Sequence, residues 1–442
     1  MIARLAALGL AAMCWVAASA EAEDIRTFNG HGGPVKAIAL LSNGGAILTA
    51  SFDNSVGVWP MEEDGPARWL EAHDAAVNAV IPLSGGRAAS GGDDFNVVLW
   101  DVENGVPLRH LMGHTGKVMG LSATADGTQL ASASWDGTVR IWDTATGTEL
   151  AVLNDHEGPV NAVIWAADGA RLYSAGYDGT VLEWATDDWA VSRRLATHGF
   201  GINVMALNET AGWLAYGALD GGTRAVDLVT GRQLSDLTAG RRPILSMAQS
   251  PDGTRLAVGD GEGYIMVVET PEWRILRDFR AARHGPVWAL AFTAAGTAVI
   301  AGGIADEAFL WPLDALENAP RMATLQRDFH TPPEDVANGE RQFLRKCSIC
   351  HTLGVDGARR AGPPLAGLFG RKAGAVTGYP YSDAIRALDL VWTEATIDAL
   401  FDVGPDHYIP GTKMPMQRIS AASDRADLID FLKRETALGV VP

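Results

Sequence analysis

A repeat of about 42 residues runs through the first three hundred positions and constrains the fold more than any other feature of the sequence. Histidines recur at intervals of 42, 41, 42 and 42 residues, at His31, His73, His114, His156 and His198. Tryptophans follow the same period, each of the first four with an aspartate six residues before it, at Trp59, Trp100, Trp142, Trp184 and Trp311. Such units stack on one another, because one alone cannot bury its apolar face.

Gly-His early in the unit and Trp-Asp late in it resemble the WD-repeat family, whose units are the blades of a β-propeller. The resemblance implies an all-β propeller of seven four-stranded blades around a central channel, over residues 24–313. A strand at residues 25–28 is expected to complete the seventh blade, which would leave no exposed sheet edge at the closure. Residues 321–326 are the competing candidate for that strand.

The repeated polar residues are expected to stabilise the blades. In the WD-repeat family, His, Ser or Thr, Asp and Trp form a buried hydrogen-bonded network inside one blade, and buried polar groups need such partners. The best-preserved set here is His114, Ser132 or Ser134, Asp136 and Trp142. We interpret these residues as structural rather than catalytic or metal-binding.

A second kind of motif stands near the C-terminus. Cys347-Ser348-Ile349-Cys350-His351 has the spacing of a haem c attachment site. On one helical turn, the two thiols face the two vinyl groups of a haem, and the imidazole reaches the iron. A redox dithiol and a zinc half-site are alternatives, but the remaining cysteine, Cys14, lies in the N-terminal segment, and a zinc site needs two more ligands.

Segments around this motif resemble the class I, mitochondrial-type cytochrome c family. The matching segments follow the order of the family and are 335–339, 362–365, 368–372, 378–382, 408–414 and 425–433. The resemblance implies an all-α domain over residues 331–442, whose last helix packs on its first. A linker at residues 314–330, with Pro320 as a break, would join it to the propeller.

The same resemblance implies one haem c, attached through Cys347 and Cys350, with His351 and Met414 as axial ligands of the iron. The Pro363 carbonyl would accept the other ring N–H of the histidine. The family also places further residues against the haem, namely Arg371, Tyr379, Tyr381 and Trp392 at the propionates and Thr412 beside the methionine. Met416 is a rival ligand on spacing alone, and Phe401 stands where the family often has a tyrosine. No catalytic residue is assigned.

The first twenty residues are expected to be a cleavable signal peptide. Arg4 precedes the apolar stretch 5–16, and Ala18-Ser19-Ala20 fits a cleavage site. The uncharged run over residues 5–20 is shorter than the roughly 18 to 20 residues that span a bilayer, although an uncleaved anchor is the alternative. No second run of that length follows. We therefore expect a periplasmic protein with no membrane span in the mature chain.

The charge is unevenly distributed along the chain. From Glu334 onward there are 13 Lys and Arg against 14 Asp and Glu, whereas the rest carries 22 against 39. The net charge of −18 argues against nucleic acid as a partner, because phosphate recognition requires clustered Lys and Arg. Lys346, Lys372 and Lys413 are expected near the haem edge. There they would meet an acidic redox partner, or they are only solvated surface.

Together these features predict a periplasmic monohaem electron carrier. Its propeller would be a docking platform for redox protein partners, such as a membrane-bound respiratory or dehydrogenase complex. The alternative is a haem-fed periplasmic oxidoreductase with a substrate or second cofactor in the propeller funnel, because cytochrome nitrite reductases also join a cytochrome c domain to a propeller. A filled sixth position on the iron favours the carrier, and whether the chain is an enzyme stays open.

Overall fold

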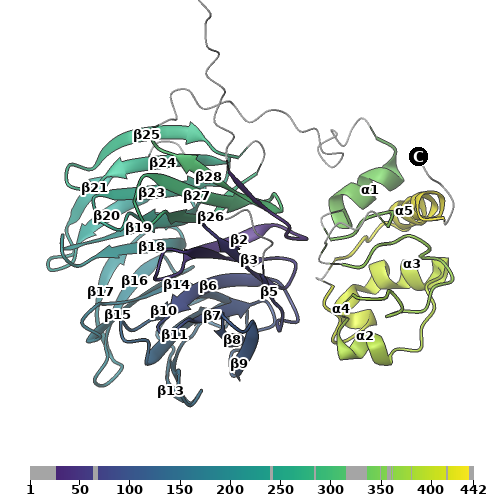
Figure 1. The fold of residues 1–442 in the computed structure, drawn as a ribbon, viewed down its shortest axis with the longest axis horizontal. Helices are drawn as coiled ribbons and strands as arrows, with labels where there is room; N and C mark the ends of the chain where they lie inside the picture. The colour runs from purple at the N-terminus through teal and green to yellow at the C-terminus, as the bar shows by residue number, and fades with distance from the viewer. Residues whose placement is uncertain are drawn as a thin grey trace, which may run out of the picture.

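The structure is a computed structural model of the 442-residue chain, and it describes residues 26–62, 68–238, 242–282, 285–314, 336–348, 350–355, 360, 362–379, 381–414 and 417–437. These residues form two parts, a set of seven four-stranded antiparallel sheets and a smaller part with helices α1 to α5 (Figure 1). The predicted all-β propeller and all-α domain are therefore confirmed. The predicted signal peptide, residues 315–330 of the linker, the alternative strand at 321–326 and Met416 lie outside the described residues.

Each sheet is one blade of the propeller, and six of the seven use four consecutive strands. The first four blades consist of β2 (Val35–Leu40), β3 (Ala46–Ser51), β4 (Val56–Pro60), β5 (Arg68–Leu70); β6 (Val77–Leu83), β7 (Arg87–Gly92), β8 (Val97–Asp101), β9 (Val106–Leu111); β10 (Val118–Ala123), β11 (Gln129–Ser134), β12 (Val139–Asp143), β13 (Glu149–Leu153); β14 (Val160–Trp165), β15 (Arg171–Gly176), β16 (Thr180–Ala185) and β17 (Val191–Thr197). The other three consist of β18 (Ile202–Asn208), β19 (Trp213–Ala218), β20 (Thr223–Asp227), β21 (Gln233–Asp236); β22 (Ile244–Gln249), β23 (Arg255–Asp260), β24 (Tyr264–Glu269), β25 (Arg274–Arg280); β26 (Val287–Phe292), β27 (Ala298–Gly303), β28 (Glu307–Pro312) and β1 (Thr27–Asn29).

The seventh blade joins the two ends of the propeller. Strand β1 pairs antiparallel with β28, and Phe28 lies opposite Ala308. Phe28 is 3% exposed and packs in the same apolar cluster as Trp59 of the first blade. The predicted closure by the N-terminal strand is confirmed, and it covers a sheet edge that would otherwise be open to pairing.

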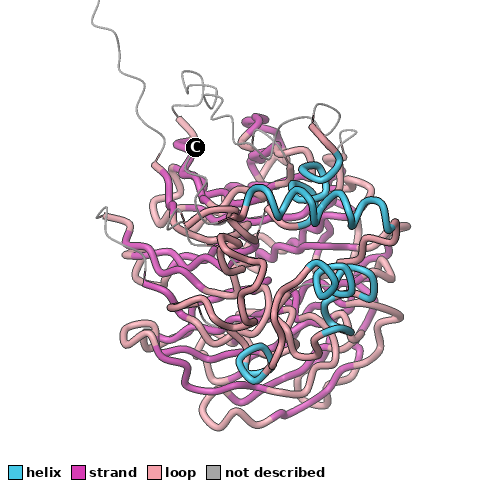
Figure 2. Tube along the Cα trace, turned by 90° about the vertical axis from the view of Figure 1, so that its right-hand side faces the viewer, coloured by secondary structure: helices cyan, strands magenta, loops and turns pink. Residues whose placement is uncertain are grey.

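Apolar side chains fill the spaces between neighbouring blades. Leu48 and Val56 of the first blade, for example, pack with Val98 and Trp100 of the second. Each blade thus buries its apolar face against the next one, as the repeat period predicts. Turns of the first three blades line one cavity together with residues of the helical part, so these turns face that part. Figure 2 looks onto the helical part, with the strands of the propeller behind it.

The helical part consists of α1 (Asn338–Lys346), α2 (Asp383–Ala387), α3 (Glu394–Val403), α4 (Pro405–Tyr408) and α5 (Ala422–Glu435). The first helix lies against the last, as predicted. A Cβ on Gly339 would lie 2.1 Å from the Asp427 carbonyl oxygen, so the two helices approach closely only because this residue is glycine. The rings of Phe343 and Phe431 pack nearby, 5.5 Å between centroids. Within the part of the chain that the structure describes, no helix has the length and apolar character needed to cross a membrane.

Candidate functional site

The Cys-x-x-Cys-His segment is a tight turn that continues from the end of α1. The N–H of Cys347 donates to the Phe343 carbonyl at 2.8 Å. The N–H groups of Cys350 and His351 both donate to the Cys347 carbonyl, at 3.0 and 2.8 Å. The turn therefore holds both cysteines and the histidine together, as the spacing predicts.

A downstream loop orients the imidazole of His351. Its Nδ1 lies 2.7 Å from the Pro363 carbonyl oxygen, and this confirms the predicted contact. Gly362 donates its N–H to the Cys350 carbonyl at 2.6 Å, and a Cβ on it would lie 2.3 Å from Cε1 of the histidine. Burial lowers the pKa of His351, although the bond to Pro363 acts in the opposite direction. A neutral imidazole held in this way can bind a metal through its other nitrogen.

The predicted site residues surround a single cavity of about 610 Å³. All ten of them line it: Cys347, Cys350, His351, Pro363, Arg371, Tyr379, Tyr381, Trp392, Thr412 and Met414. Further walls are apolar and include Leu365, Leu368, Ile397, Leu400 and Phe401. Two thiols, an imidazole and a thioether around an apolar cavity are the donor set of a haem c site, and the close approach at Gly362 leaves the histidine facing that cavity. The residues present therefore fit the cofactor.

The polar members of the set have partners of their own. The terminal nitrogens of Arg371 donate to the carbonyls of Ala366 and Pro364, at 2.8 and 2.9 Å, and burial lowers its pKa. The rings of Tyr379 and Tyr381 pack edge to face, 4.7 Å between centroids. These three lie together as expected, and their propionate roles stay predictions.

The hydroxyl of Thr412 is hydrogen-bonded beside the candidate distal ligand. It accepts a hydrogen bond from the N–H of Met414 at 3.2 Å. This bond places Thr412 next to Met414, as the family resemblance implies.

Both thiols are held in their neutral form by their surroundings. Burial raises the pKa of Cys347 to about 12, with a further contribution from Cys350, and it raises that of Cys350 to about 11. A reactive redox dithiol instead needs a thiol whose pKa is lowered. The redox-dithiol interpretation of this motif therefore loses support.

Residues of the propeller also line this cavity, and sequence reasoning missed them. They are Phe52, Asn54, Ala75, Ala76, Asp93, Phe95 and Lys117, all in or beside the turns of the first three blades. The repeat register places such residues in turns, but it carries no information on what lies opposite a turn. No pattern in the sequence pointed to them.

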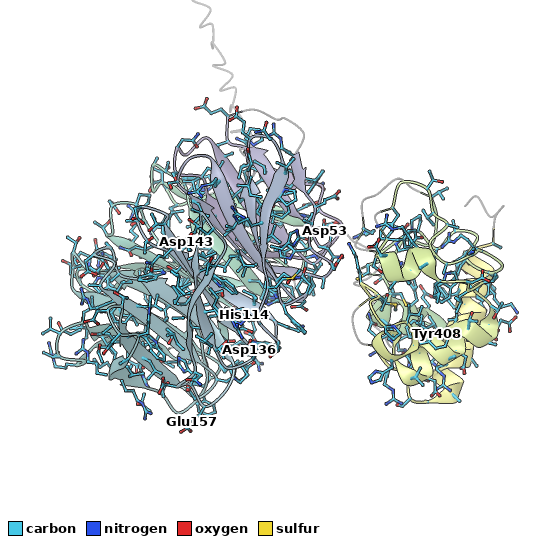
Figure 3. All side chains as sticks on the ribbon, turned by 90° about the horizontal axis from the view of Figure 1, so that it is seen from below. Asp53, His114, Asp136, Asp143, Glu157 and Tyr408 are labelled. Carbon is cyan, nitrogen blue, oxygen red and sulfur yellow. The ribbon has the colours of Figure 1, made fainter. Side chains whose placement is uncertain are left out.

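The repeated polar residues form a chain of hydrogen bonds inside each of the first four blades. In the third, Trp142 donates to Ser132 at 2.9 Å, and Ser132 and Asp136 flank the two nitrogens of His114, each at 2.8 Å. Figure 3 labels His114 and Asp136 of this blade. The equivalent sets are His31, Thr49, Asp53, Trp59; His73, Ser90, Asp94, Trp100; and His156, Ser174, Asp178, Trp184. The predicted network is confirmed, and Ser132 is the serine that contacts His114. The Ser134 hydroxyl donates to the Gly116 carbonyl and accepts from the backbone N–H of Asp136.

The fifth blade departs from this pattern. His198 contacts Asp220 through Nε2 at 2.9 Å, but its Nδ1 accepts from Arg224, and Val226 takes the tryptophan position. Among the described residues, no group of three or more His, Cys, Asp and Glu side chains is arranged to hold a metal ion.

Comparison with known proteins finds relatives of both parts. Residues 336–435 match the Cytochrome c family, and residues 22–60, 65–101, 105–143 and 147–184 match the WD domain, G-beta repeat family. Cytochrome c of Sesamum indicum is 44% identical over 108 residues, which are 24% of this chain and 95% of that protein. Cytochrome c of Cannabis sativa is 43% identical over 108 residues, which are 24% of this chain and 95% of that protein. Cytochrome c of Theileria annulata is 40% identical over 116 residues, which are 26% of this chain and 99% of that protein.

Proposed function

Because the chain belongs to the cytochrome c family through residues 336–435 and carries WD repeats before them, we propose that it is a periplasmic monohaem electron carrier whose propeller docks protein partners. The observation that carries this proposal is the single cavity that all ten predicted haem-binding residues line. The cytochrome c relatives imply a covalently bound haem c, and electron transfer is the chemistry that such a domain supports.

Each donor around the cavity has one proposed role. Cys347 and Cys350 would hold the haem through thioether bonds, and His351 and Met414 would bind its iron. The bound haem supplies one-electron redox chemistry, with a potential that a thioether ligand raises. The hydrogen bond from Nδ1 of His351 to Pro363 fixes the ring and increases its basicity toward the metal.

The surroundings of the cavity support electron transfer rather than substrate turnover. If His351 and Met414 both bind the iron, as proposed, they would leave no position on it for a substrate. Many of the walls are apolar, and the hydrophobicity around a cofactor is one of the means by which a protein sets its redox potential. Arg371 lies at the cavity with a charged guanidinium that suits a buried carboxylate such as a propionate.

The proposed location rests on the first twenty residues, whose Arg4, apolar stretch and Ala18-Ser19-Ala20 fit a signal peptide. N-terminal sequencing of the protein from a periplasmic extract is expected to begin at Glu21. A chain that keeps Met1 and sediments with membranes would contradict cleavage.

The proposed partner of the propeller is a redox protein with a basic surface, such as part of a membrane-bound respiratory or dehydrogenase complex. The support for this choice is charge, because the chain before Glu334 carries 22 Lys and Arg against 39 Asp and Glu. Purification of the tagged protein at low and at high salt would test it, with salt-sensitive recovery of a haem or flavin protein as the expected result.

A redox titration with metal analysis tests the carrier itself. The purified protein is expected to contain one iron per chain, to titrate as a single one-electron couple and to bind no carbon monoxide when reduced. A second metal or organic cofactor, or carbon monoxide binding by the unaltered protein, would favour the oxidoreductase instead.

A further inference from the structure

The haem cavity opens toward the chain's own propeller. Phe52 lies in the turn between β3 and β4, and Phe95 in the turn between β7 and β8; both line the cavity together with His351 and Met414. Asp93 and Lys117 lie beside them and form an ion pair at 2.5 Å. The face of the helical part through which a class I cytochrome would meet a partner is thus turned to the propeller.

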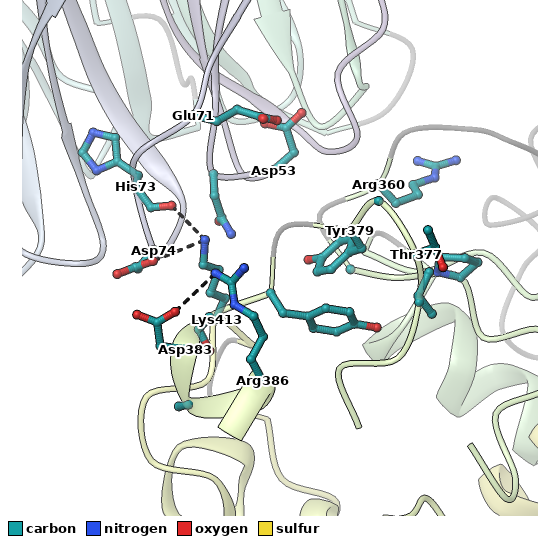
Figure 4. Close-up of a pocket in the computed structure, with 18 of the residues that line it drawn as sticks. Asp53, Glu71, His73, Asp74, Arg360, Thr377, Tyr379, Asp383, Arg386 and Lys413 are labelled. Carbon is teal, nitrogen blue, oxygen red and sulfur yellow. Dashed lines mark hydrogen bonds and ion pairs between the residues drawn. The ribbon is translucent and has the colours of Figure 1, made fainter. Parts of the chain in front are cut away.

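Charged contacts hold the two parts in this arrangement. Lys413, the residue before the candidate ligand Met414, lies 3.3 Å from Asp74 and also donates to the His73 carbonyl at 3.3 Å (Figure 4). Arg360 pairs with Asp306 at 3.4 Å. Lys413 was expected at an exposed rim, but its side chain is 18% exposed because the propeller covers it.

The backbones also touch at one point. A Cβ on Gly32 would lie 2.4 Å from the Cα of Arg360. The first blade can approach this loop of the helical part so closely only because glycine follows His31 here, where the next three repeats have Asp74, Thr115 and Glu157.

A second cavity, of about 890 Å³, lies between the two parts beside the haem site. Asp53, Glu71 and Asp74 line it from the propeller, and Arg360, Arg386 and Lys413 from the helical part (Figure 4). Asp383 also lines it from the helical part and pairs with Arg386 at 3.4 Å, so that wall keeps a net positive charge opposite an acidic propeller wall. Such complementarity directs two surfaces toward each other, while the space between them shows that they are not tightly packed.

We propose that the propeller is the cytochrome domain's own docking partner, and that an external redox protein reaches the haem face only after the two parts separate. The proposal rests on the proposed function, since it assumes a haem in the cavity. The carboxylate of Asp74 is 73% exposed, and an ion pair with such an exposed partner contributes little, so the docked state is readily reversed. The 21 residues between Asp314 and Val336 allow separation, because an extended chain spans about 3.3 Å per residue.

Asp74→Lys tests the proposal, and Glu157→Lys is its matched control. Both residues follow the repeat histidine, and both donate their N–H to the network aspartate, at 2.9 and 3.0 Å. Asp74 contacts Lys413, whereas Glu157 lies at the lower edge of the propeller in Figure 3, away from the helical part. The two substitutions change the net charge equally, so only the interface distinguishes them.

Two measurements on the full-length haem protein report the result. Small-angle scattering gives the radius of gyration, and stopped-flow gives the rate of reduction by a protein-sized donor, reduced plant cytochrome c, and by ascorbate. Asp74→Lys is expected to enlarge the radius of gyration and to speed reduction by the protein donor about fivefold. A fivefold change corresponds to the largest contribution that is usual for an ion pair with an exposed partner. Asp74→Lys with Lys413→Glu is expected to restore both values, and Glu157→Lys to change neither.

Two outcomes would overturn the proposal. One is a radius and protein-donor rate in Asp74→Lys that equal those of the unaltered chain, and the other is an equal change in Glu157→Lys. Failure of the proposed function looks different, because ascorbate would then reduce no haem in any variant.

Discussion

Nδ1 of His351 lies 2.7 Å from the carbonyl oxygen of Pro363, so a loop twelve residues downstream orients the candidate iron ligand. The preceding Gly362 packs against the same ring and has room for no Cβ, which would lie 2.3 Å from the imidazole. The position of the histidine therefore depends on a glycine that makes no bond to it.

Gly362→Ala is expected to displace this ring and to lower haem incorporation. Overpacking of this kind costs about 1–3 kcal/mol. Haem content per chain and the melting temperature followed at the haem band would measure the effect. Gly354→Ala is the control, because none of the residues that the structure describes lies within 4 Å of a Cβ there. Equal haem content in the two variants would contradict the account of the loop.

Gly339→Ala is expected to separate α1 from α5. The new Cβ would lie 2.1 Å from the Asp427 carbonyl oxygen and 2.9 Å from the Phe431 side chain. We expect a loss of about 1–3 kcal/mol in the stability of the helical part, with the propeller unaffected. Thermal unfolding followed at a haem wavelength reports on the helical part, and unfolding followed in the far ultraviolet also reports on the propeller. A haem transition at an unchanged temperature would show that the helices tolerate the methyl group.

Phe28→Ala tests closure of the propeller by β1. Phe28 is buried in an apolar cluster with Trp59, whereas Thr27 on the same strand is exposed. Removal of a buried phenyl group costs about 3–5 kcal/mol, so Phe28→Ala is expected to lower the melting temperature of the propeller and Thr27→Ala to leave it nearly unchanged. Equal melting temperatures would mean that this strand contributes little to the ring.

Acid is expected to destabilise the propeller through its buried aspartates. Burial alone would raise the pKa of Asp136, but hydrogen bonds from His114 and Thr138 outweigh it and hold that pKa well below its usual value. The folded state therefore binds this proton more weakly than the unfolded state. The resulting stabilisation is complete above the unfolded pKa, about 3.9, and is lost as the pH falls toward the folded value.

Asp136→Asn removes this titration. The variant is expected to have a lower free energy of unfolding than the unaltered protein at neutral pH. The difference between the two free energies is expected to become smaller below about pH 4. Urea unfolding of the propeller between pH 3 and 7 would measure it, with the exposed Asp187→Asn as control. A difference that stays constant across this range would exclude the proposed linkage.

The repeat register predicted the propeller well because it depends on local periodicity. It gave the number of blades and the closing strand even though Val226 and Val268 replace tryptophan in the fifth and sixth units. It did not separate Ser132 from Ser134, because residues two apart on a strand share one face. Only the hydrogen-bond geometry distinguishes them.

The haem cavity was likewise predictable, because its residues occur in an ordered series of motifs along one domain. All ten predicted haem-binding residues line this cavity. The interface was not predictable. Lys413 and Asp74 are far apart in the sequence, and no period or motif links them. Contacts of this kind depend on the shapes and charges of two folded surfaces, which no local sequence pattern describes.

The optical spectrum of the oxidised protein tests the central claim most directly, namely that His351 and Met414 hold one haem as an electron carrier. The account predicts the weak sulfur-to-iron band in the far red for the unaltered chain and for Met416→Ala. Met414→Ala is expected to lose the band, to have a lower potential and to bind carbon monoxide. Absence of haem from the unaltered chain, or a band that Met414→Ala keeps and Met416→Ala loses, would contradict it.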